Sequence, residues 1–185
     1  MSFVSVVGGS DFLSVMTDGR VTHEGEIVQE DYPKYRMIGE SIVVAFTGDR
    51  AACEWIFEAL NKEVVMKQDF MKTARDIKEL LNHHPILEGS DVRWIIGGIN
   101  PQNEMDCIVI STEESEPIRY EVPSEGIMTV YAYPFDAEYE ELNDKLLEFL
   151  DQEGKLISAQ QLLNDYVAEN DFSVNKNIYH ALIEK

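Results

Sequence analysis

The sequence has few cysteines and no long apolar run. Cys53 and Cys107 are its only cysteines in 185 residues, too few for a disulfide framework. No apolar run approaches the ~20 residues that a membrane-spanning helix needs. The first residues also lack the basic and then apolar pattern of a signal peptide. We therefore expect a reduced, cytoplasmic protein without a membrane segment.

Positive charge is also scarce. The chain carries 15 Lys and Arg residues against 35 Asp and Glu residues, a formal net charge of −20. Such a chain repels a polyphosphate backbone and an anionic membrane surface, so we expect neither nucleic acid nor a membrane as a partner. Much of the acidity lies in residues 136–153, which hold eight acids and one lysine. This run predicts either a solvated face or a bias towards basic substrates and partners.

Apolar residues, in contrast, are plentiful. They make up 44% of the chain and aromatic residues 10%, which excludes a disordered protein. A chain of 185 residues is long enough to bury a sizeable core. We expect one domain over residues 1–185.

The apolar residues alternate along some segments and recur at helical spacing along others. Strands are expected at residues 2–7, 12–17, 35–38, 41–46, 92–99, 105–111, 118–122, 127–131 and 175–183. Helices are expected at residues 51–60, 70–81, 136–150 and 158–168, with Asp49 as the N-cap of the first. Residues 20–30 predict a loop or a weak strand pair. Two sheets with helices on their outer faces are the economical packing for this order.

Four residues near the start of the chain stand out by their spacing. Ser2 opens the first apolar run, Asp18 follows the second, Lys34 precedes the third and Gly48 follows the fourth. Each has an ordinary alternative: a strand serine, a turn ion pair of Asp18 with Arg20, a surface lysine, and a glycine that ends a strand. In their shared register they resemble the opening of a proteasome β-type subunit, a member of the N-terminal-nucleophile hydrolase superfamily.

The resemblance implies a fold and a set of roles. The fold is α+β, a four-layer α-β-β-α sandwich with two antiparallel sheets between helical layers. Ser2 is the implied nucleophile, and the Lys34 ammonium favours its deprotonated form. Asp18 orients Lys34, and the Gly48 backbone N–H faces the oxyanion. Arg20 is implied as a structural partner near Asp18.

A hydroxyl residue at a chain terminus supplies two catalytic groups by itself. Its hydroxyl attacks the carbonyl, and its α-amine, with an ordinary pKa of about 7.7–8.0, acts as the base. Ser2 is therefore competent only after Met1 has been removed. Methionine is commonly removed when a small residue such as serine follows. A retained Met1 abolishes the mechanism, because it turns the amine into an amide and moves the free terminus by up to ~3.6 Å.

Two later segments depart from the family's pattern. The family has a Gly-Ser-Gly-like segment whose serine supports the terminal amine, whereas residues 130–135 read Val-Tyr-Ala-Tyr-Pro-Phe. Asp171 and Ser173 only approximate the family's later Asp-x-x-Ser pair, and the resemblance assigns them supporting roles. Both departures count against full activity.

Two functions therefore remain open. The first is an amidohydrolase or peptidase that cleaves a peptide or amide substrate through an acyl-enzyme on Ser2. The second is a catalytically inactive relative that serves as an assembly or binding module. Relatives assemble into rings or barrels, so the resemblance implies a homo-oligomer. It implies no metal and no organic cofactor. The His83-His84 pair reads as a helix end and Cys107 as a core residue.

Overall fold

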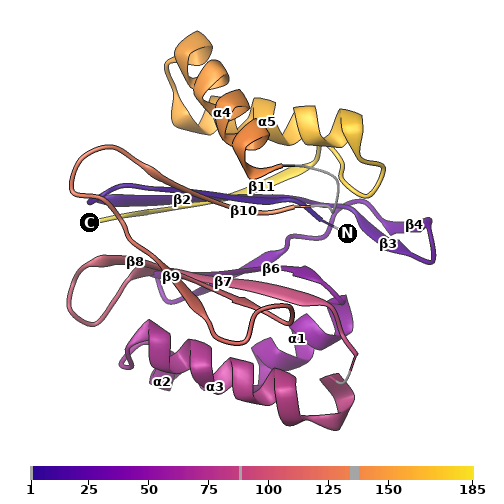
Figure 1. The fold of residues 1–185 in the computed structure, drawn as a ribbon, viewed down its shortest axis with the longest axis vertical. Coiled ribbons are helices and arrows are strands. Elements are labelled where there is room, and N and C mark those ends of the chain that lie inside the picture. The colour runs from indigo at the N-terminus through magenta and orange to yellow at the C-terminus, as the bar shows by residue number, and fades with distance from the viewer. Residues whose placement is uncertain (1, 88, 134–137) are drawn as a thin grey trace.

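The computed structural model describes residues 2–87, 89–133 and 138–185. The two larger sheets of the described residues are both antiparallel (Figure 1). The first has the strand order β10-β1-β2-β11. Its strands are β1 (Val4–Gly8), β2 (Phe12–Asp18), β10 (Met128–Ala132) and β11 (Ile178–Glu184). Every residue of β1 is buried, because this strand has a partner on each edge and packing on each face.

The second sheet has the order β5-β6-β7-β8-β9. Its strands are β5 (Tyr35–Ile38), β6 (Ile42–Gly48), β7 (Val92–Ile99), β8 (Met105–Ser111) and β9 (Ile118–Tyr120). In β6, Val43 and Ala45 pack against the first sheet, whereas Val44 and Phe46 pack towards the helices. This central strand is therefore apolar on both faces.

Helices cover the outer face of each sheet, so the layers follow the order helix, sheet, sheet, helix (Figure 1). On the second sheet lie α1 (Arg50–Ala59), α2 (Lys62–Val65), α3 (Phe70–His83) and a 3-10 turn (Pro85–Leu87). On the first sheet lie α4 (Tyr139–Glu153) and α5 (Leu156–Asn170). The expected α-β-β-α sandwich is confirmed.

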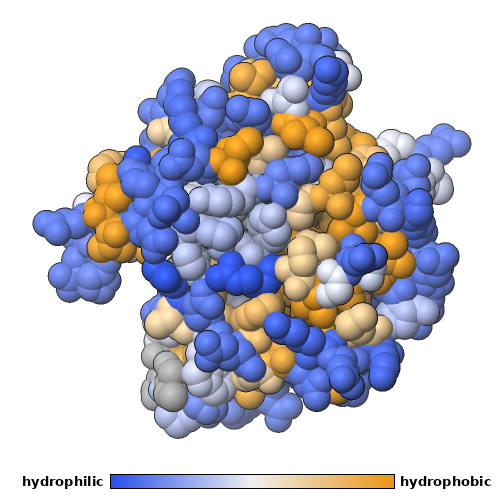
Figure 2. All heavy atoms as spheres, turned by 180° about the vertical axis from the view of Figure 1, so that it is seen from behind, coloured by the Kyte–Doolittle hydropathy of each residue, from blue (hydrophilic) through white to orange (hydrophobic). Residues whose placement is uncertain are grey.

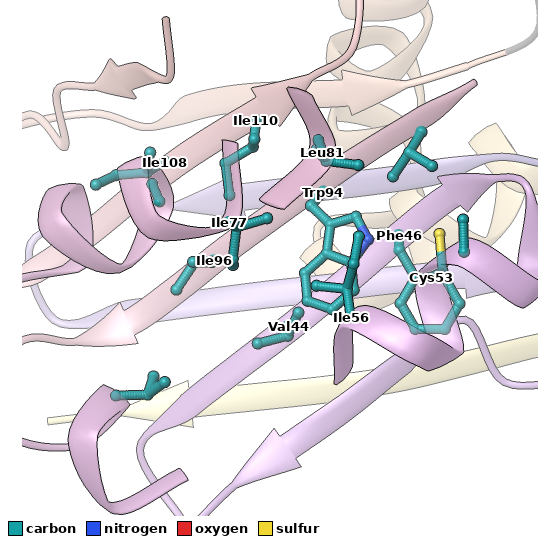
Figure 3. Packing of buried hydrophobic residues seen from close by; sticks show 14 of the residues in the cluster. Val44, Phe46, Cys53, Ile56, Ile77, Leu81, Trp94, Ile96, Ile108 and Ile110 are labelled. Atoms are coloured by element: carbon teal, nitrogen blue, oxygen red, sulfur yellow. The ribbon is translucent and has the colours of Figure 1, made fainter. Parts of the chain in front are cut away.

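Figure 3 shows the apolar layer between the second sheet and its helices. The Trp94 and Phe46 rings stack there with centroids 5.8 Å apart, and Ile56 and Ile77 reach them from α1 and α3. Full burial of one such side chain contributes about 1.5–3 kcal/mol. This layer therefore holds β6, and with it Gly48, in a fixed position.

The element boundaries agree with most expectations. Asp49 is the N-cap of α1, as predicted, and its carboxylate accepts the backbone N–H of Ala52 at 3.0 Å. The expected helix at 136–150 begins at Tyr139, and residues 134–137 lie outside the described part of the chain. A strand pair, β3 (Val21–His23) with β4 (Glu26–Gln29), forms in the segment expected to be a loop or a weak strand pair.

The acidic run of residues 136–153 lies mainly on α4. Each of its described acids is exposed to solvent: Glu138, Glu140, Glu141, Asp144, Glu148, Asp151 and Glu153. Figure 2 shows hydrophilic atoms over most of one face of the molecule, with hydrophobic atoms in separate areas. The run is therefore a solvated helix face. No helix in the described ranges is long and apolar enough to cross a bilayer.

Candidate active site

A small cavity lies where the ends of several strands meet. Its volume is about 60 Å³. The residues that line it are Ser2, Arg20, Val21, Thr22, Tyr32, Lys34, Phe46, Thr47, Gly48 and Arg50. Ser2 lies two residues before β1 of the first sheet, whereas Lys34 precedes β5 and Gly48 ends β6 of the second. The fold thus brings three of the expected site residues, Ser2, Lys34 and Gly48, to one cavity.

The expected residue Asp18 lies behind the cavity wall and holds its parts together. Its Oδ1 accepts a hydrogen bond from Lys34 Nζ at 2.6 Å and from the Phe3 backbone N–H at 2.8 Å. Its Oδ2 accepts the Arg20 backbone N–H at 2.8 Å. The Asp18 N–H in turn donates to the Phe3 carbonyl at 3.2 Å. Because Phe3 follows Ser2 directly, Asp18 fixes both Lys34 and the start of β1.

Lys34 is buried beside its acidic partner. The Lys34 and Asp18 side chains are 4% and 0% exposed. The Lys34 carbonyl accepts the Phe46 N–H at 2.9 Å, which aligns the residue with β6. Burial lowers the pKa of Lys34 below its ordinary value, although Asp18 acts in the opposite direction. The Lys34 ammonium therefore loses its proton more readily than the ammonium of a surface lysine.

Gly48 occupies a backbone position that suits only glycine. Its φ angle is +98°, in a region that residues with a side chain rarely adopt. A Cβ atom at this position would lie 2.0 Å from the Asp91 carbonyl oxygen, which belongs to the backbone and cannot swing away. The same carbonyl accepts the Asp49 N–H at 2.7 Å. Gly48 thus ends β6 and allows the close approach to Asp91, and its backbone is exposed.

Arg20 lies near Asp18, as expected, but its side chain points to other partners. Only its backbone N–H contacts Asp18, so the alternative interpretation, a turn ion pair between these two residues, is wrong. The guanidinium makes a two-pronged contact with Glu30, in which both N–O distances are 3.0 Å. It also donates to the Phe172 carbonyl at 2.5 Å. Asp18 thus pairs with Lys34, and Arg20 pairs with Glu30.

Asp171 and Ser173 lie on either side of Phe172 and bond to each other. The Ser173 hydroxyl donates to Asp171 Oδ1 at 2.5 Å, and the Ser173 N–H donates to the same atom at 2.6 Å. Neither residue lines the cavity. Their connection to it runs through Arg20, which binds the intervening carbonyl.

The bulky segment at residues 130–135 is partly described. Val130, Tyr131 and Ala132 form the end of β10, where Ala132 lies opposite Val4. Tyr131 is buried and stacks on Phe3 with the ring centroids 6.3 Å apart. Pro134 and Phe135 lie outside the described residues, as does Met1. Tyr131 therefore supports the residue next to Ser2 through packing.

Two polar residues that the sequence analysis missed complete the surroundings. Asn175 accepts the Gly19 N–H at 2.9 Å and donates to the Glu30 carbonyl at 2.8 Å. Glu30 binds Arg20, so Asn175, Glu30 and Arg20 form one network beside the turn after Asp18. No local motif marks these residues, because 145 positions separate Glu30 from Asn175.

The other nucleophile and ligand candidates have ordinary surroundings. Burial raises the pKa of Cys53 to about 12 and raises the pKa of Cys107 as well, so neither thiol forms a thiolate near neutral pH. The His84 ring packs on Trp55 with the centroids 4.2 Å apart. Within the described ranges, no group of three or more histidine, cysteine or acidic side chains is arranged to hold a metal ion.

The comparisons with known proteins bear on the fold. No protein-family model matches the sequence. No curated protein matches it either. Among solved structures, the chain is similar to eukaryotic HslV from Trypanosoma brucei, with a TM-score of 0.75 and 15% identity over 99% of each chain. Two chains that superpose over nearly their whole lengths share an architecture, whatever their sequence identity. The α-β-β-α sandwich of this chain is therefore the proteasome-like N-terminal-nucleophile hydrolase fold.

Proposed function

We propose that this protein is an N-terminal-serine amidohydrolase that cleaves a peptide or amide bond once removal of Met1 has left Ser2 as the first residue. One observation carries the proposal: Ser2, Lys34 and Gly48 line the same cavity, and a buried carboxylate fixes the lysine. A hydroxyl, a cation and an exposed turn of backbone are the groups that acyl transfer needs.

The first half of the reaction forms an acyl-enzyme. The Ser2 hydroxyl proton passes to the Ser2 α-amine while Oγ bonds to the substrate carbonyl carbon. The Gly48 N–H donates to the oxyanion that develops on the carbonyl oxygen. The carbon–nitrogen bond then breaks, and the proton held by the α-amine moves to the departing nitrogen. The products are a free amine and an ester on Ser2.

The second half releases the acid. Water gives a proton to the same α-amine while its oxygen bonds to the ester carbonyl carbon. The Ser2 oxygen then leaves and regains a proton from the amine. In both halves the Lys34 ammonium lowers the energy of negative charge on Ser2 Oγ, and Asp18 holds the ammonium in place. No step of this reaction requires a metal or an organic cofactor.

A catalytically inactive protein can have the same fold, and one segment favours this second candidate. Residues 130–133 are bulky and bring no serine towards the start of β1. In this alternative the protein is an inactive homologue that serves as an assembly or binding module. A homo-oligomer accompanies either function, and light scattering of the purified protein tests for it.

Chemical modification of Ser2 separates the two candidates. The test material is untagged protein whose intact mass shows the loss of Met1. We expect a β-lactone, which acylates activated hydroxyls, to add one label to Ser2, located by peptide mass spectrometry. Lys34→Ala should suppress the label, whereas Ser10→Ala, which removes an exposed serine from the first hairpin, should leave it unchanged. Absence of a label on Ser2 in protein without Met1 favours the silent module.

A further inference from the structure

One cation on the cavity wall has no acidic partner. Lys34 is paired with Asp18, and Arg20 is paired with Glu30. Arg50, the first residue of α1, lines the same cavity, and no carboxylate lies within ion-pair distance of it in the described part of the chain. The cavity therefore carries an unmatched positive charge.

Arg50 is held at this place by contacts that leave its charge free. Its guanidinium lies over the Tyr32 ring, 4.1 Å from the centroid, and donates to the Gln29 side-chain oxygen at 3.0 Å. Arg36 lies near the same Tyr32 ring, at 5.4 Å, and its own charge is matched by Glu54. Stacking on an aromatic face orders an arginine and leaves the N–H groups at the edge of its guanidinium plane available to an acceptor. Arg50 is thus held at the cavity wall by contacts with neutral groups.

The cavity is also small and has well-packed walls. Its volume of about 60 Å³ is well below the ~300–1,000 Å³ of pockets that bury drug-sized ligands. Tyr32 and Phe46 line it and are 6% and 3% exposed, so the packed core supports them from behind. The enclosed part of the cavity therefore favours a small group over a bulky one. A short planar group, such as a carboxylate on one methylene, fits the space and the charge.

We propose that the cavity beside Ser2 takes a small carboxylate-bearing group of the substrate, and that Arg50 is the residue that selects it. The carboxylate belongs either to an acidic side chain or to a chain terminus, and both present the same two oxygens to a guanidinium. As a statement about substrate specificity, this inference rests on the proposed function. It does not depend on turnover for its test, because binding to the cavity needs no chemistry.

Matched peptide amides measure the selection in the active protein. They differ only in the residue whose carbonyl is attacked: Asp, Asn, Leu or Lys. We expect kcat/KM for Asp to exceed that for the isosteric Asn by on the order of tenfold, about 1.4 kcal/mol. Arg50→Gln should bring this ratio close to one, and Arg50→Lys should retain part of it. Arg75→Gln, which removes an exposed arginine on α3 outside the cavity, should leave the ratio unchanged.

Two further arms make every outcome informative. Peptides with a free terminal carboxylate, compared with their amidated forms, show whether the terminus or the side chain is selected. Calorimetric binding of N-acetyl-Asp-amide and N-acetyl-Asn-amide to the Ser2→Ala protein tests the cavity when no peptide is cleaved. Preferred binding of the aspartyl probe that is lost in Arg50→Gln supports the inference even if hydrolysis is never observed. Equal binding of both probes, or faster cleavage of the leucyl or lysyl substrate, overturns it.

Discussion

The Lys34 ammonium lies 2.6 Å from Oδ1 of Asp18, in an ion pair whose side chains are 4% and 0% exposed. Asp18 ends β2 of the first sheet, and Lys34 precedes β5 of the second, so the pair joins the two sheets at the cavity. The same carboxylate accepts the N–H groups of Phe3 and Arg20. One buried acid therefore sets the position of the lysine and of the chain start at the same time.

Loss of this acid should be costly for folding. Asp18→Ala leaves the Lys34 ammonium buried without its counter-charge and two backbone N–H groups without their acceptor. We expect the free energy of unfolding to fall by about 3–5 kcal/mol, the usual cost of breaking a buried pair from one side. Urea denaturation at neutral pH measures it. Asp76→Ala breaks the exposed pair with Lys72, whose side chains are 53% and 64% exposed. That control should cost at most ~1 kcal/mol, and similar losses in both variants would contradict the structural role.

The pH dependence of activity should report on Lys34. The proposed mechanism needs the Ser2 amine neutral and Lys34 charged, so kcat/KM should be bell-shaped in pH. Burial lowers the pKa of Lys34 below its ordinary value of 10.5. The ammonium is therefore lost at a lower pH than in an exposed lysine, and the alkaline limb should lie below pH 10.5.

A conservative variant tests the assignment of that limb. Arginine keeps its proton to above pH ~12, so in Lys34→Arg the alkaline limb should move upwards while the acidic limb stays in place. Initial rates over the range from about pH 5 to about pH 11 give both limbs. An alkaline limb that does not move in this variant belongs to another group, and Lys34 is then not the cation that the reaction needs.

The two cysteines should be inert in the folded protein. Cys53 and Cys107 are both fully buried, and burial raises the pKa of Cys53 to about 12. The thiolate is the reactive form, so at about pH 8 a disulfide reagent such as DTNB should react slowly with the native protein. In denaturant both thiols become exposed and should react at once. Rapid reaction of the native protein would show that the layer around Cys53 or the layer between the sheets around Cys107 opens more readily than its packing indicates.

Much of the fold was predictable because its strands form local hairpins. The pairs β1–β2 and β5–β6 join strands that are close in sequence, and glycine marks the end of β6. The spacing of Ser2, Lys34 and Gly48 follows from these hairpins, since each residue stands at a strand end. The four layers could therefore be expected from the order of the elements, whereas the candidate site residues came from the resemblance of their spacing to that of a proteasome β-type subunit.

Contacts between distant segments were not predictable in this way. Asn175 and Glu30 meet only because β11 returns beside β2, after more than half of the chain has intervened. Asp-Gly-Arg reads as a local ion pair, yet tertiary contacts give Asp18 to Lys34 and Arg20 to Glu30. The unmatched charge of Arg50 also has no sequence signal, because it depends on which acids fail to reach it.

The strain at Gly48 gives the sharpest test of the oxyanion site. Gly48→Ala places a methyl group 2.0 Å from the Asp91 carbonyl oxygen at a φ angle of +98°. The end of β6 must move to relieve this clash, which displaces the Gly48 N–H. We expect kcat to fall by on the order of 10²–10³, together with a clear loss of thermal stability.

Gly126→Ala separates the effect of the φ angle from the effect of the clash. Gly126 has a φ angle of +86°, and no atom lies within 4 Å of its would-be Cβ. This variant should lose only the ~1–2 kcal/mol of a left-handed residue with a side chain and keep full kcat. Steady-state kinetics and thermal denaturation of the two variants decide the matter. If Gly48→Ala is destabilised yet retains its kcat, the N–H of residue 48 has moved without consequence, and the oxyanion donor must be sought elsewhere on the cavity wall.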